Sequence, residues 1–234
     1  MPLELRSSGD RGLAEMDWLH SQHTFSFADF HDPSFMGFGP LRVINEDQIQ
    51  PNTGFPTHGH RDMEILSYVM EGELEHKDDM GNGSIIRPGE IQRMSAGTGI
   101  RHSEYNPSSD QRNRFFQIWI IPEIDGIEPG YEQIEFPDGA RDGTLYQIGS
   151  RHGGEGGVTI HQDATLYASI LSPGDTVSHA TASNRGVWIQ LASGVIAVNG
   201  QEMKAGDGLA ITDEVAVDIA ATEKSEFLLF DLAM

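Results

Sequence analysis

Short runs of apolar and β-branched residues, separated by turn residues, recur along the whole chain. In the first half these runs cover residues 64–70, 84–87, 90–96 and 114–122. In the second half they cover residues 166–171, 187–192, 195–198, 208–212 and 226–232. Turn signals such as Glu71-Gly72, Pro88-Gly89 and Asn199-Gly200 separate the runs. Short strands at this spacing are typical of a sandwich or barrel, and helical periodicity is scarce. We therefore expect an all-β protein.

The two halves of the chain resemble each other. Residues 67–97 and residues 187–214 both read as a strand, a glycine turn, a strand, an Asn-Gly turn, a strand, an x-Gly-acid turn and a strand. In this match Gly72 corresponds to Gly194, and Gly89 to Gly206. Such an internal repeat predicts two similar β-barrels. The segment that joins them, near residues 122–142, is rich in Pro, Gly and acidic residues. We place the N-terminal domain at 1–130 and the C-terminal domain at 131–234.

Composition narrows the classes of partner and of site. The 234 residues carry a formal net charge of -21, which makes direct binding to nucleic acid or to an anionic membrane surface unfavourable. There is no cysteine, so a disulfide framework is excluded and a metal would have to be held by His, Asp or Glu. The first residues contain no apolar signal-peptide core, and no apolar run reaches the length of a membrane helix. We expect a soluble cytoplasmic protein.

Two pairs of potential metal ligands lie in strand-forming sequence. His58 and His60 are two positions apart, and so are His102 and Glu104. Residues two apart in a strand point to the same face, so each pair presents its side chains together. Glu64 shares the face of the first pair if that strand is unbroken.

If the two strands face each other inside a barrel, three imidazoles and one carboxylate converge. Such a nitrogen and oxygen set suits iron, manganese, cobalt, nickel, copper or zinc, and it leaves coordination positions open. The alternative is that these are surface histidines. Two such pairs beside glycine turns in a cysteine-free β protein favour the metal site.

The residues around these pairs resemble a known family. The run GFPTHGHRDMEILSYVMEGELEHKDDMGNGSIIRPGEIQRMSAGTGIRHSE, residues 54–104, is similar to the signature region of the pirin family, within the cupin superfamily. Upstream, HTFSFADFHDP and GFGPLRVINED resemble its bacterial quercetin 2,3-dioxygenase-like branch. The resemblance implies a bicupin, which is two stacked jelly-roll β-barrels with one metal in the N-terminal barrel.

The resemblance also implies a ligand set. The family's ligands carry over onto His58, His60, His102 and Glu104. Glu64 stands where many other cupins place their metal glutamate, so we treat it as a candidate to orient an imidazole or to accept a substrate proton. An ion pair of Glu64 with Arg61 or Arg93 is the structural alternative.

The second half lacks this set. The offsets of the two histidines from Gly72, counted back from Gly194, fall on Ala180 and Ala182, with His179 beside them. The counterpart of His102, counted from Gly206, is Ile219. We therefore predict one metal, and not two.

The remaining histidines give weaker signals. His23, in an aromatic stretch, is expected to be a packed, hydrogen-bonded residue, or alternatively to approach the mouth of a pocket. His76 is expected to face solvent, and His152 and His161 are given no role. Phe55, Met63 and the aromatic residues of 25–38 are candidates for an apolar pocket wall.

The resemblance implies a metal-dependent dioxygenase that opens the central ring of flavonols such as quercetin with O2 and releases carbon monoxide. In that hypothesis the metal, for which Fe(II) is our first choice, holds the substrate, and Glu104 or Glu64 takes the hydroxyl proton. The polyphenol and O2 are the expected partners of a monomer. The alternatives are a redox-sensing regulator that acts through protein partners, and a metal-stabilised barrel without turnover.

Overall fold

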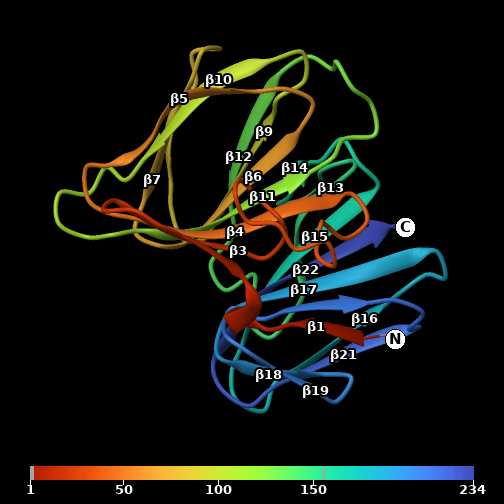
Figure 1. The fold of residues 1–234 in the computed structure, drawn as a ribbon. Coiled ribbons are helices and arrows are strands. Elements are labelled where there is room, and N and C mark those ends of the chain that lie inside the picture. Colours follow the sequence, from red (N-terminus) through yellow and green to blue (C-terminus); the bar gives the residue numbers. More distant parts are fainter. Residues whose placement is uncertain (1–2, 155) are drawn as a thin grey trace.

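The chain forms two β-sandwiches stacked on each other (Figure 1). The computed structural model describes residues 3–154 and 156–234. Each sandwich pairs a seven-stranded sheet with a four-stranded sheet. The one helix within the described residues is the short 3-10 turn η1 (Ser8–Asp10). The expected all-β bicupin architecture is confirmed.

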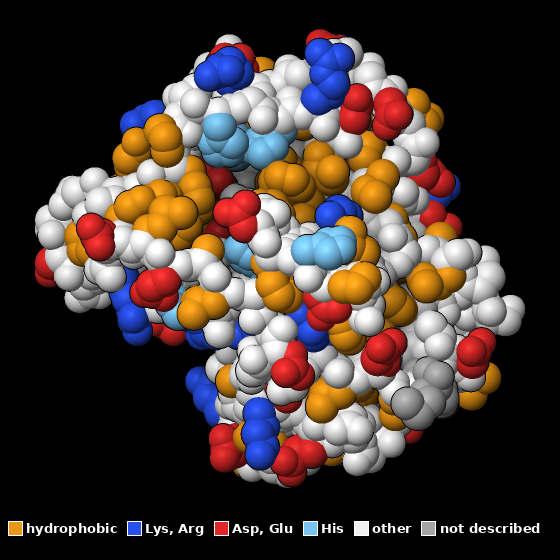
Figure 2. Space-filling model, in the orientation of Figure 1, with side chains coloured by type: hydrophobic (Ala, Val, Ile, Leu, Met, Phe, Trp, Pro, Cys, Tyr) orange, Lys and Arg blue, Asp and Glu red, His pale blue; other side chains and the backbone are white. Residues whose placement is uncertain are grey.

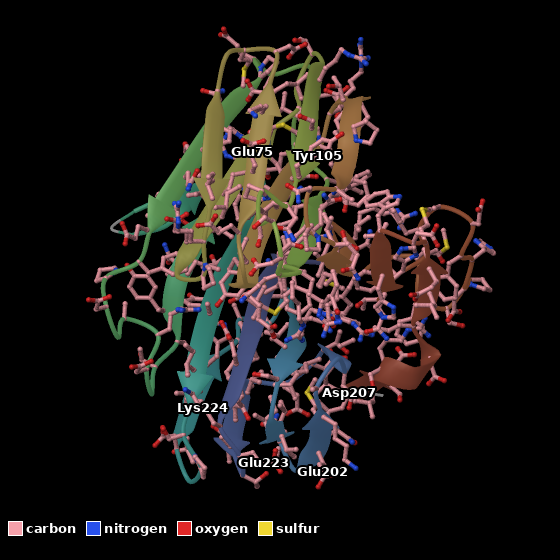
Figure 3. The ribbon with its side chains drawn as sticks, turned by 90° about the vertical axis from the view of Figure 1, so that its left-hand side faces the viewer. Glu75, Tyr105, Glu202, Asp207, Glu223 and Lys224 are labelled. Carbon is pink, nitrogen blue, oxygen red and sulfur yellow. The ribbon has the colours of Figure 1, made fainter. Side chains whose placement is uncertain are left out.

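The first barrel holds the signature region. Its seven-stranded sheet has the order β12 (Gly130–Glu135), β9 (Glu90–Ser95), β6 (Glu64–Glu71), β11 (Arg114–Ile120), β4 (Leu41–Ile49), β3 (Leu19–His23) and β2 (Gly12–Glu15). Its four-stranded sheet has the order β5 (Gly54–His60), β10 (Ile100–Tyr105), β7 (Leu74–Asp78) and β8 (Gly83–Ile86). Figure 3 shows this barrel above the second one, with Glu75 and Tyr105 labelled on it.

The second barrel repeats the same order. Its seven-stranded sheet runs β1 (Leu3–Arg6), β20 (Gly208–Ile211), β17 (Arg185–Ser193), β22 (Ser225–Ala233), β15 (Ala164–Leu171), β13 (Tyr146–Ser150) and β14 (Val158–Thr159). Its four-stranded sheet runs β16 (Thr176–Ala180), β21 (Ala216–Ala221), β18 (Val195–Val198) and β19 (Gln201–Lys204). Each strand has a counterpart at the same place in the first barrel.

The turns that reveal the repeat also have the same backbone shape. Gly72 and Gly194 have φ angles of 71° and 84°, and Gly89 and Gly206 have φ angles of 93° and 88°. These left-handed conformations favour glycine because it lacks a Cβ atom. The matched glycines therefore mark equivalent turns in the two barrels.

The first strand of the chain crosses to the second barrel. β1 pairs with β20, and β12 takes the equivalent edge place in the first barrel beside β9. The division into 1–130 and 131–234 stays a prediction, and strand pairing refines it. β1 goes with the second barrel, and β12, which begins at the division, goes with the first.

The two seven-stranded sheets pack face to face. Their shared core combines residues such as Leu66, Phe116 and Ile118 of the first barrel with Trp188 and Phe230 of the second. Burial of this much apolar surface is the main force holding the barrels together.

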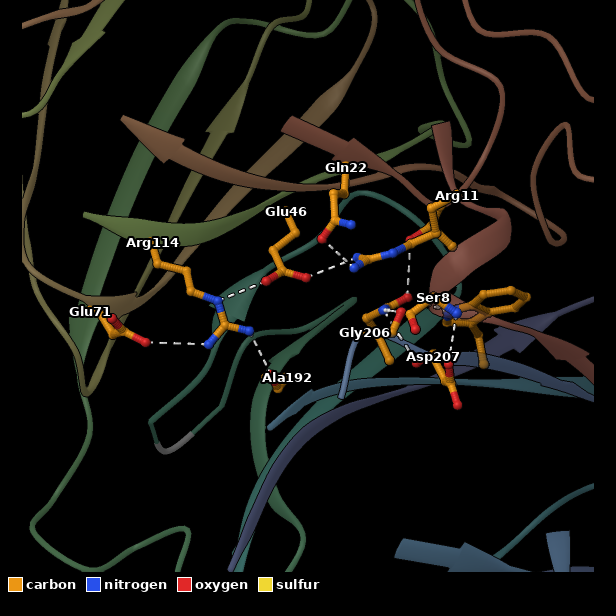
Figure 4. Close-up of polar contacts among 12 residues, drawn as sticks. Ser8, Arg11, Gln22, Glu46, Glu71, Arg114, Ala192, Gly206 and Asp207 are labelled. Atoms are coloured by element: carbon orange, nitrogen blue, oxygen red, sulfur yellow. Dashed lines mark hydrogen bonds and ion pairs between the residues drawn. The ribbon is translucent and has the colours of Figure 1, made fainter. Parts of the chain in front are cut away.

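Ion pairs lie at the edge of this interface (Figure 4). Arg114 donates to Glu46 at 2.7 Å and to the backbone carbonyl of Ala192 at 2.6 Å. Arg11 donates to the other Glu46 oxygen at 2.9 Å. The arrangement leaves no oxygen of this buried carboxylate unpaired.

Candidate metal centre

Two neighbouring strands bring three of the predicted ligands together. β5 and β10 are antiparallel, and their register pairs His102 with His58. The Nε2 atoms of these two histidines lie 3.1 Å apart. The ring of His60 lies 4.7 Å from that of His58 and 4.9 Å from that of His102, centroid to centroid. One nitrogen from each of the three rings falls within 4.8 Å of the others.

Burial favours the neutral form of two of these imidazoles, those of His60 and His102. Loss of hydration, and secondly the nearby His58, lowers the pKa of His60 to about 4. Burial also lowers the pKa of His102, and its histidine neighbours add to that shift. A neutral imidazole has a free lone pair, which is the form that binds a metal.

Glu104 lies next to the three-histidine cluster, close to His102. A shift in register after His102 pairs Glu104 with Phe55 of β5. The carboxylate is 1% exposed and accepts hydrogen bonds from Gln117 Nε2 at 2.7 Å and from Ser67 Oγ at 3.3 Å. Burial, followed by the charge of Asp47, raises the pKa of Glu104 to about 7. A cation at the cluster would favour the ionised form of this carboxyl.

His76 does not face solvent, so that prediction is wrong. It is 1% exposed and forms a second close group with His102 and Glu104. Its Nδ1 lies 3.4 Å from His102 Nδ1, and its Nε2 lies 3.2 Å from Asp78 Oδ2. β7 carries polar residues on both faces, so alternation could not tell the inner face from the outer one. The row from Asp78 through His76 to His102 fixes the ring that would bind the metal.

The donor set fits a divalent transition metal. The three imidazoles converge from β5 and β10, and the carboxylate of Glu104 is already oriented by two donors. Nitrogen and oxygen donors of this kind suit the late first-row metals and iron. The assignment of His58, His60, His102 and Glu104 as ligands is a proposal.

A cavity of about 440 Å³ opens beside the cluster. It is lined by Ala14, Met16, Leu19, Ser21, His23, Phe27, Ala28, Asn45, Asp47, Phe55, Pro56, Thr57, His58, His60, Glu104, Gln117 and Trp119. Figure 2 shows histidine side chains beside hydrophobic ones on this part of the surface. A cavity of this size with apolar walls and a few polar groups is typical of a small-molecule site.

Glu64 lies on a different face from the histidines. β5 ends at His60 and β6 begins at Glu64, so the parity argument fails at the break between them. Glu64 is 1% exposed and accepts hydrogen bonds from the backbone N–H of His161 at 3.1 Å and from its ring Nδ1 at 3.0 Å. The expected shared face is therefore wrong, and the partner of Glu64 is His161 rather than Arg61 or Arg93.

The expected pocket wall is found in part. Phe55 and Phe27 line the cavity, whereas Met63 packs beside Ile65 in a separate apolar cluster. Phe38 stacks near Trp188 between the barrels, with ring centroids 5.7 Å apart.

His23 meets both expectations, because it is buried, contacts Ser21 Oγ at 2.9 Å and also lines the cavity. Asn45, Asp47, Gln117 and Trp119 line the cavity as well, although no motif indicated them.

The second barrel keeps a histidine at one ligand position and has apolar residues at two others. Glu104 pairs with His76, four residues after Gly72, and Ile219 pairs with Val198, four residues after Gly194. This register makes Ile219 the counterpart of Glu104.

The remaining counterparts follow from the same pairing. His102 pairs with His58, and Val217 pairs with His179, so these are equivalent pairs. The counterparts of the ligands that we predicted by counting residues from the matched glycines were therefore wrong. The loops between the strands differ in length in the two barrels. His179 is bound to Asp231, with Nε2 and Oδ2 2.7 Å apart.

Comparison with known proteins agrees with this geometry. The pirin family model matches residues 6–120, and the quercetinase C-terminal cupin domain model matches residues 147–232. The chain is 51% identical to quercetin 2,3-dioxygenase of Escherichia coli K12 over 228 residues, 97% of each protein. The chain belongs to the pirin family.

Other pirin relatives agree over the full length. A pirin-like protein of Caulobacter vibrioides is 42% identical over 95% of this chain and 96% of its own. The crystal structure of the bacterial pirin YhhW from E. coli in complex with nickel(II) has a TM-score of 0.94 and 50% identity, and the match covers 99% of both chains. No helix within residues 3–154 and 156–234 has the length and apolar character needed to cross a membrane.

Proposed function

We propose that this pirin is a metal-dependent dioxygenase that opens flavonols such as quercetin with O2. The observation that carries the proposal is the convergence of His58, His60 and His102, of which the first two line a cavity of 440 Å³ together with Glu104. The name of the E. coli relative supports the substrate class, and the nickel(II) complex of YhhW supports a divalent metal. Fe(II) is our first choice for the native metal, because iron has the required oxygen chemistry.

The metal and Glu104 would have different roles in the reaction. A bound divalent metal would act as a Lewis acid toward the substrate hydroxyl and as a relay for electrons to O2. Glu104, with its pKa near 7, is placed to take the proton of that hydroxyl. Gln117 and Ser67 hold the carboxylate in position through their hydrogen bonds.

The cavity has apolar walls beside the histidines. Phe27, Phe55 and Trp119 form apolar walls around the space next to the histidines. A planar polyphenol can stack against these rings while one edge reaches the cluster. Such a cavity favours turnover over a sensor, which would need the ligands but not a lined binding space.

The test is oxygen uptake with quercetin by protein that has been stripped of metal and refilled with Fe(II). We expect uptake with carbon monoxide release, and we expect His60→Ala to lose metal and activity together. His152→Ala is the matched control, because His152 is an exposed histidine outside the site, and it should behave like the parent protein. Stoichiometric metal without uptake in the iron, manganese, nickel, cobalt and copper forms would reject the substrate.

A further inference from the structure

A second polar cluster lines the same cavity. It consists of His23 on β3 and of Asn45 and Asp47 on β4, which are 4%, 2% and 1% exposed. His23 and Asn45 are cross-strand partners, and Asp47 follows two positions later on the same face of β4. None of the three is a predicted metal ligand.

Four polar atoms of this cluster have no hydrogen-bond partner among the described residues, whereas the other ring nitrogen of His23 contacts Ser21 Oγ at 2.9 Å. The unpaired atoms are both carboxylate oxygens of Asp47, Oδ1 of Asn45, Nδ1 of His23 and the nearby indole Nε1 of Trp119. Buried polar atoms are nearly always hydrogen-bonded, so several unpaired atoms around one cavity indicate a bound partner.

Two other buried carboxylates show that this fold can supply hydrogen bonds to buried acids. Glu46, the residue before Asp47, receives hydrogen bonds from Arg11 and Arg114 on both oxygens. Asp207, which is 6% exposed in the second barrel, receives the backbone N–H groups of Ser8 at 2.7 Å and Lys204 at 2.8 Å. Asp47 differs from both because its acceptors point into a space that a ligand can enter.

A row of aromatic rings connects this cluster to the metal centre. His60 and Trp119 have ring centroids 5.1 Å apart, Trp119 and Phe27 5.4 Å, and Phe27 and His23 5.1 Å. All four residues line the cavity. A flat aromatic ligand can therefore contact the histidines at one end and the polar cluster at the other.

We propose that Asp47, supported by Asn45 and His23, forms a subsite that binds free hydroxyl groups on a ring of the polyphenol. The proposal rests on the proposed function for the identity of the occupant. Asp47 and Asn45 offer acceptors, so they require donors, and a phenolic hydroxyl is a donor whereas an ether or methoxy group is not. The subsite therefore selects hydroxylated flavonols over flavonols with bare or methylated rings.

The test compares two ligands without oxygen, so that binding is measured apart from turnover. Quercetin has ring hydroxyls in addition to its 3-hydroxyl group, whereas 3-hydroxyflavone has only the latter. With nickel(II)-loaded protein under argon, we expect quercetin to bind at least about tenfold tighter, as a hydrogen bond to a charged group implies. Asp47→Asn should reduce that preference to about twofold or less and leave the affinity for 3-hydroxyflavone unchanged.

Asp207→Asn is the matched control, because it makes the same change at a buried carboxylate that is fully paired. It should keep the preference for quercetin and lower the melting temperature. Asp47→Asn should instead raise the melting temperature of the ligand-free protein, because it removes an unpaired buried charge. Metal content is measured in each variant and should equal that of the parent.

Three results would overturn the proposal. They are equal weakening of both ligands by Asp47→Asn, an unchanged preference in that variant, and failure of the parent protein to bind quercetin. Binding with the expected preference but without oxygen uptake in the iron form would reject the dioxygenase and keep the subsite. Oxygen uptake in the iron form, together with an unchanged ligand preference in Asp47→Asn, would keep the dioxygenase and reject the subsite.

Discussion

The two barrels share strand order and register but differ in the chemistry of the same interior row, chiefly at its centre. In the first barrel, five neighbouring strands contribute one buried polar residue each to a continuous row: His23, Asn45, Gln117, Ser67 and Gln92. In the second barrel, the equivalent row is Gln147, Tyr167, Leu229, Ile189 and Leu209, so its last three positions are apolar. Ser67 and Ile189 each stand five residues before the matched glycine, which fixes the alignment.

The contrast separates what builds the fold from what builds the site. Both barrels form with the same turns and strand pairs, so a polar interior is not needed for the frame. The polar row does not support folding by itself, because buried polar groups cost free energy unless they are paired. Its centre holds Glu104 through Gln117 and Ser67, and its end opens on the cavity at His23. The shared core between the barrels offsets this cost.

The largest effect is expected when two metal ligands of the first barrel are replaced by their counterparts from the second barrel. The double variant His102→Val with Glu104→Ile copies Val217 and Ile219. We expect it to lose bound metal and to lower quercetin-dependent oxygen uptake at least about 10³-fold, since two of four ligands are gone. The metal-free form should unfold at a higher temperature, because apolar side chains replace buried ionisable ones. Retained stoichiometric metal would contradict the assignment.

The free energy of unfolding of the metal-free protein, measured as a function of pH, tests how much the buried carboxyl group of Asp47 destabilises the fold. Burial raises the pKa of Asp47 to about 7 from an ordinary 3.8, whereas its counterpart in the second barrel is the uncharged Ser169. The unfolded chain therefore loses this proton at a lower pH than the folded chain, so the group lowers the free energy of unfolding as pH rises through that interval. Above about 7 the loss is complete.

Chemical unfolding of the parent and of Asp47→Asn should show this loss as a difference. We expect equal stability below about pH 4 and an advantage for the variant on the order of 4 kcal/mol at pH 8. His60, whose pKa is lowered, acts in the opposite direction, but it is present in both proteins and cancels. Loss of the Asp47 charge also lowers the pKa of Glu104, which adds to the advantage of the variant in the same direction. A constant difference from pH 4 to pH 8 would show that Asp47 does not titrate in this range.

The opposite substitution places one residue of the polar row in the second barrel. Leu229→Gln copies Gln117 at a fully buried site without an acid to bind. We expect a loss of about 2–4 kcal/mol in the free energy of unfolding, because an amide is buried unpaired and apolar contacts are removed. Val215→Gln is the control, since Val215 is 84% exposed and should change stability by less than about 0.5 kcal/mol. Similar losses in both variants would argue against a tightly packed second core.

Local patterns in the sequence predict the frame and the ligand pairs. The alternation of strand residues pairs His58 with His60 and His102 with Glu104, and the matched glycines reveal the repeat. These features depend only on neighbours along the chain. The same reasoning fails for Glu64 because a short break between β5 and β6 changes the face, which alternation within one strand cannot show.

Features that depend on register between distant strands could not be predicted in this way. The polar row takes one residue from each of five separate segments, and only the pairing of β3, β4, β11, β6 and β9 aligns them. The exchange of β1 into the second barrel likewise depends on a partner about 200 residues away, β20. His76 was misplaced because both faces of its strand are polar.

The smallest expected effect concerns the row behind His102. Asp78 contacts His76, which in turn contacts His102, whereas the second barrel has Val198 in the place of His76. Replacing Asp78 with Asn removes the charge that orients this row but keeps the size of the side chain. We expect Asp78→Asn to weaken metal affinity about 10- to 100-fold, as is usual for partners of metal-binding histidines. A competition titration with a chelating dye measures this change.

The neighbouring residue provides a matched control for the same substitution. Asp79 is exposed and accepts a hydrogen bond from the backbone N–H of Arg101 at 3.1 Å, so Asp79→Asn changes the same charge outside the row. Its metal affinity should stay within about twofold of the parent, because an exposed charge is screened by solvent. If the two variants lose affinity equally, the general field of the acidic turn attracts the metal. If only Asp78→Asn loses affinity, the first barrel depends on a hydrogen-bonded row that its repeat has replaced with apolar packing.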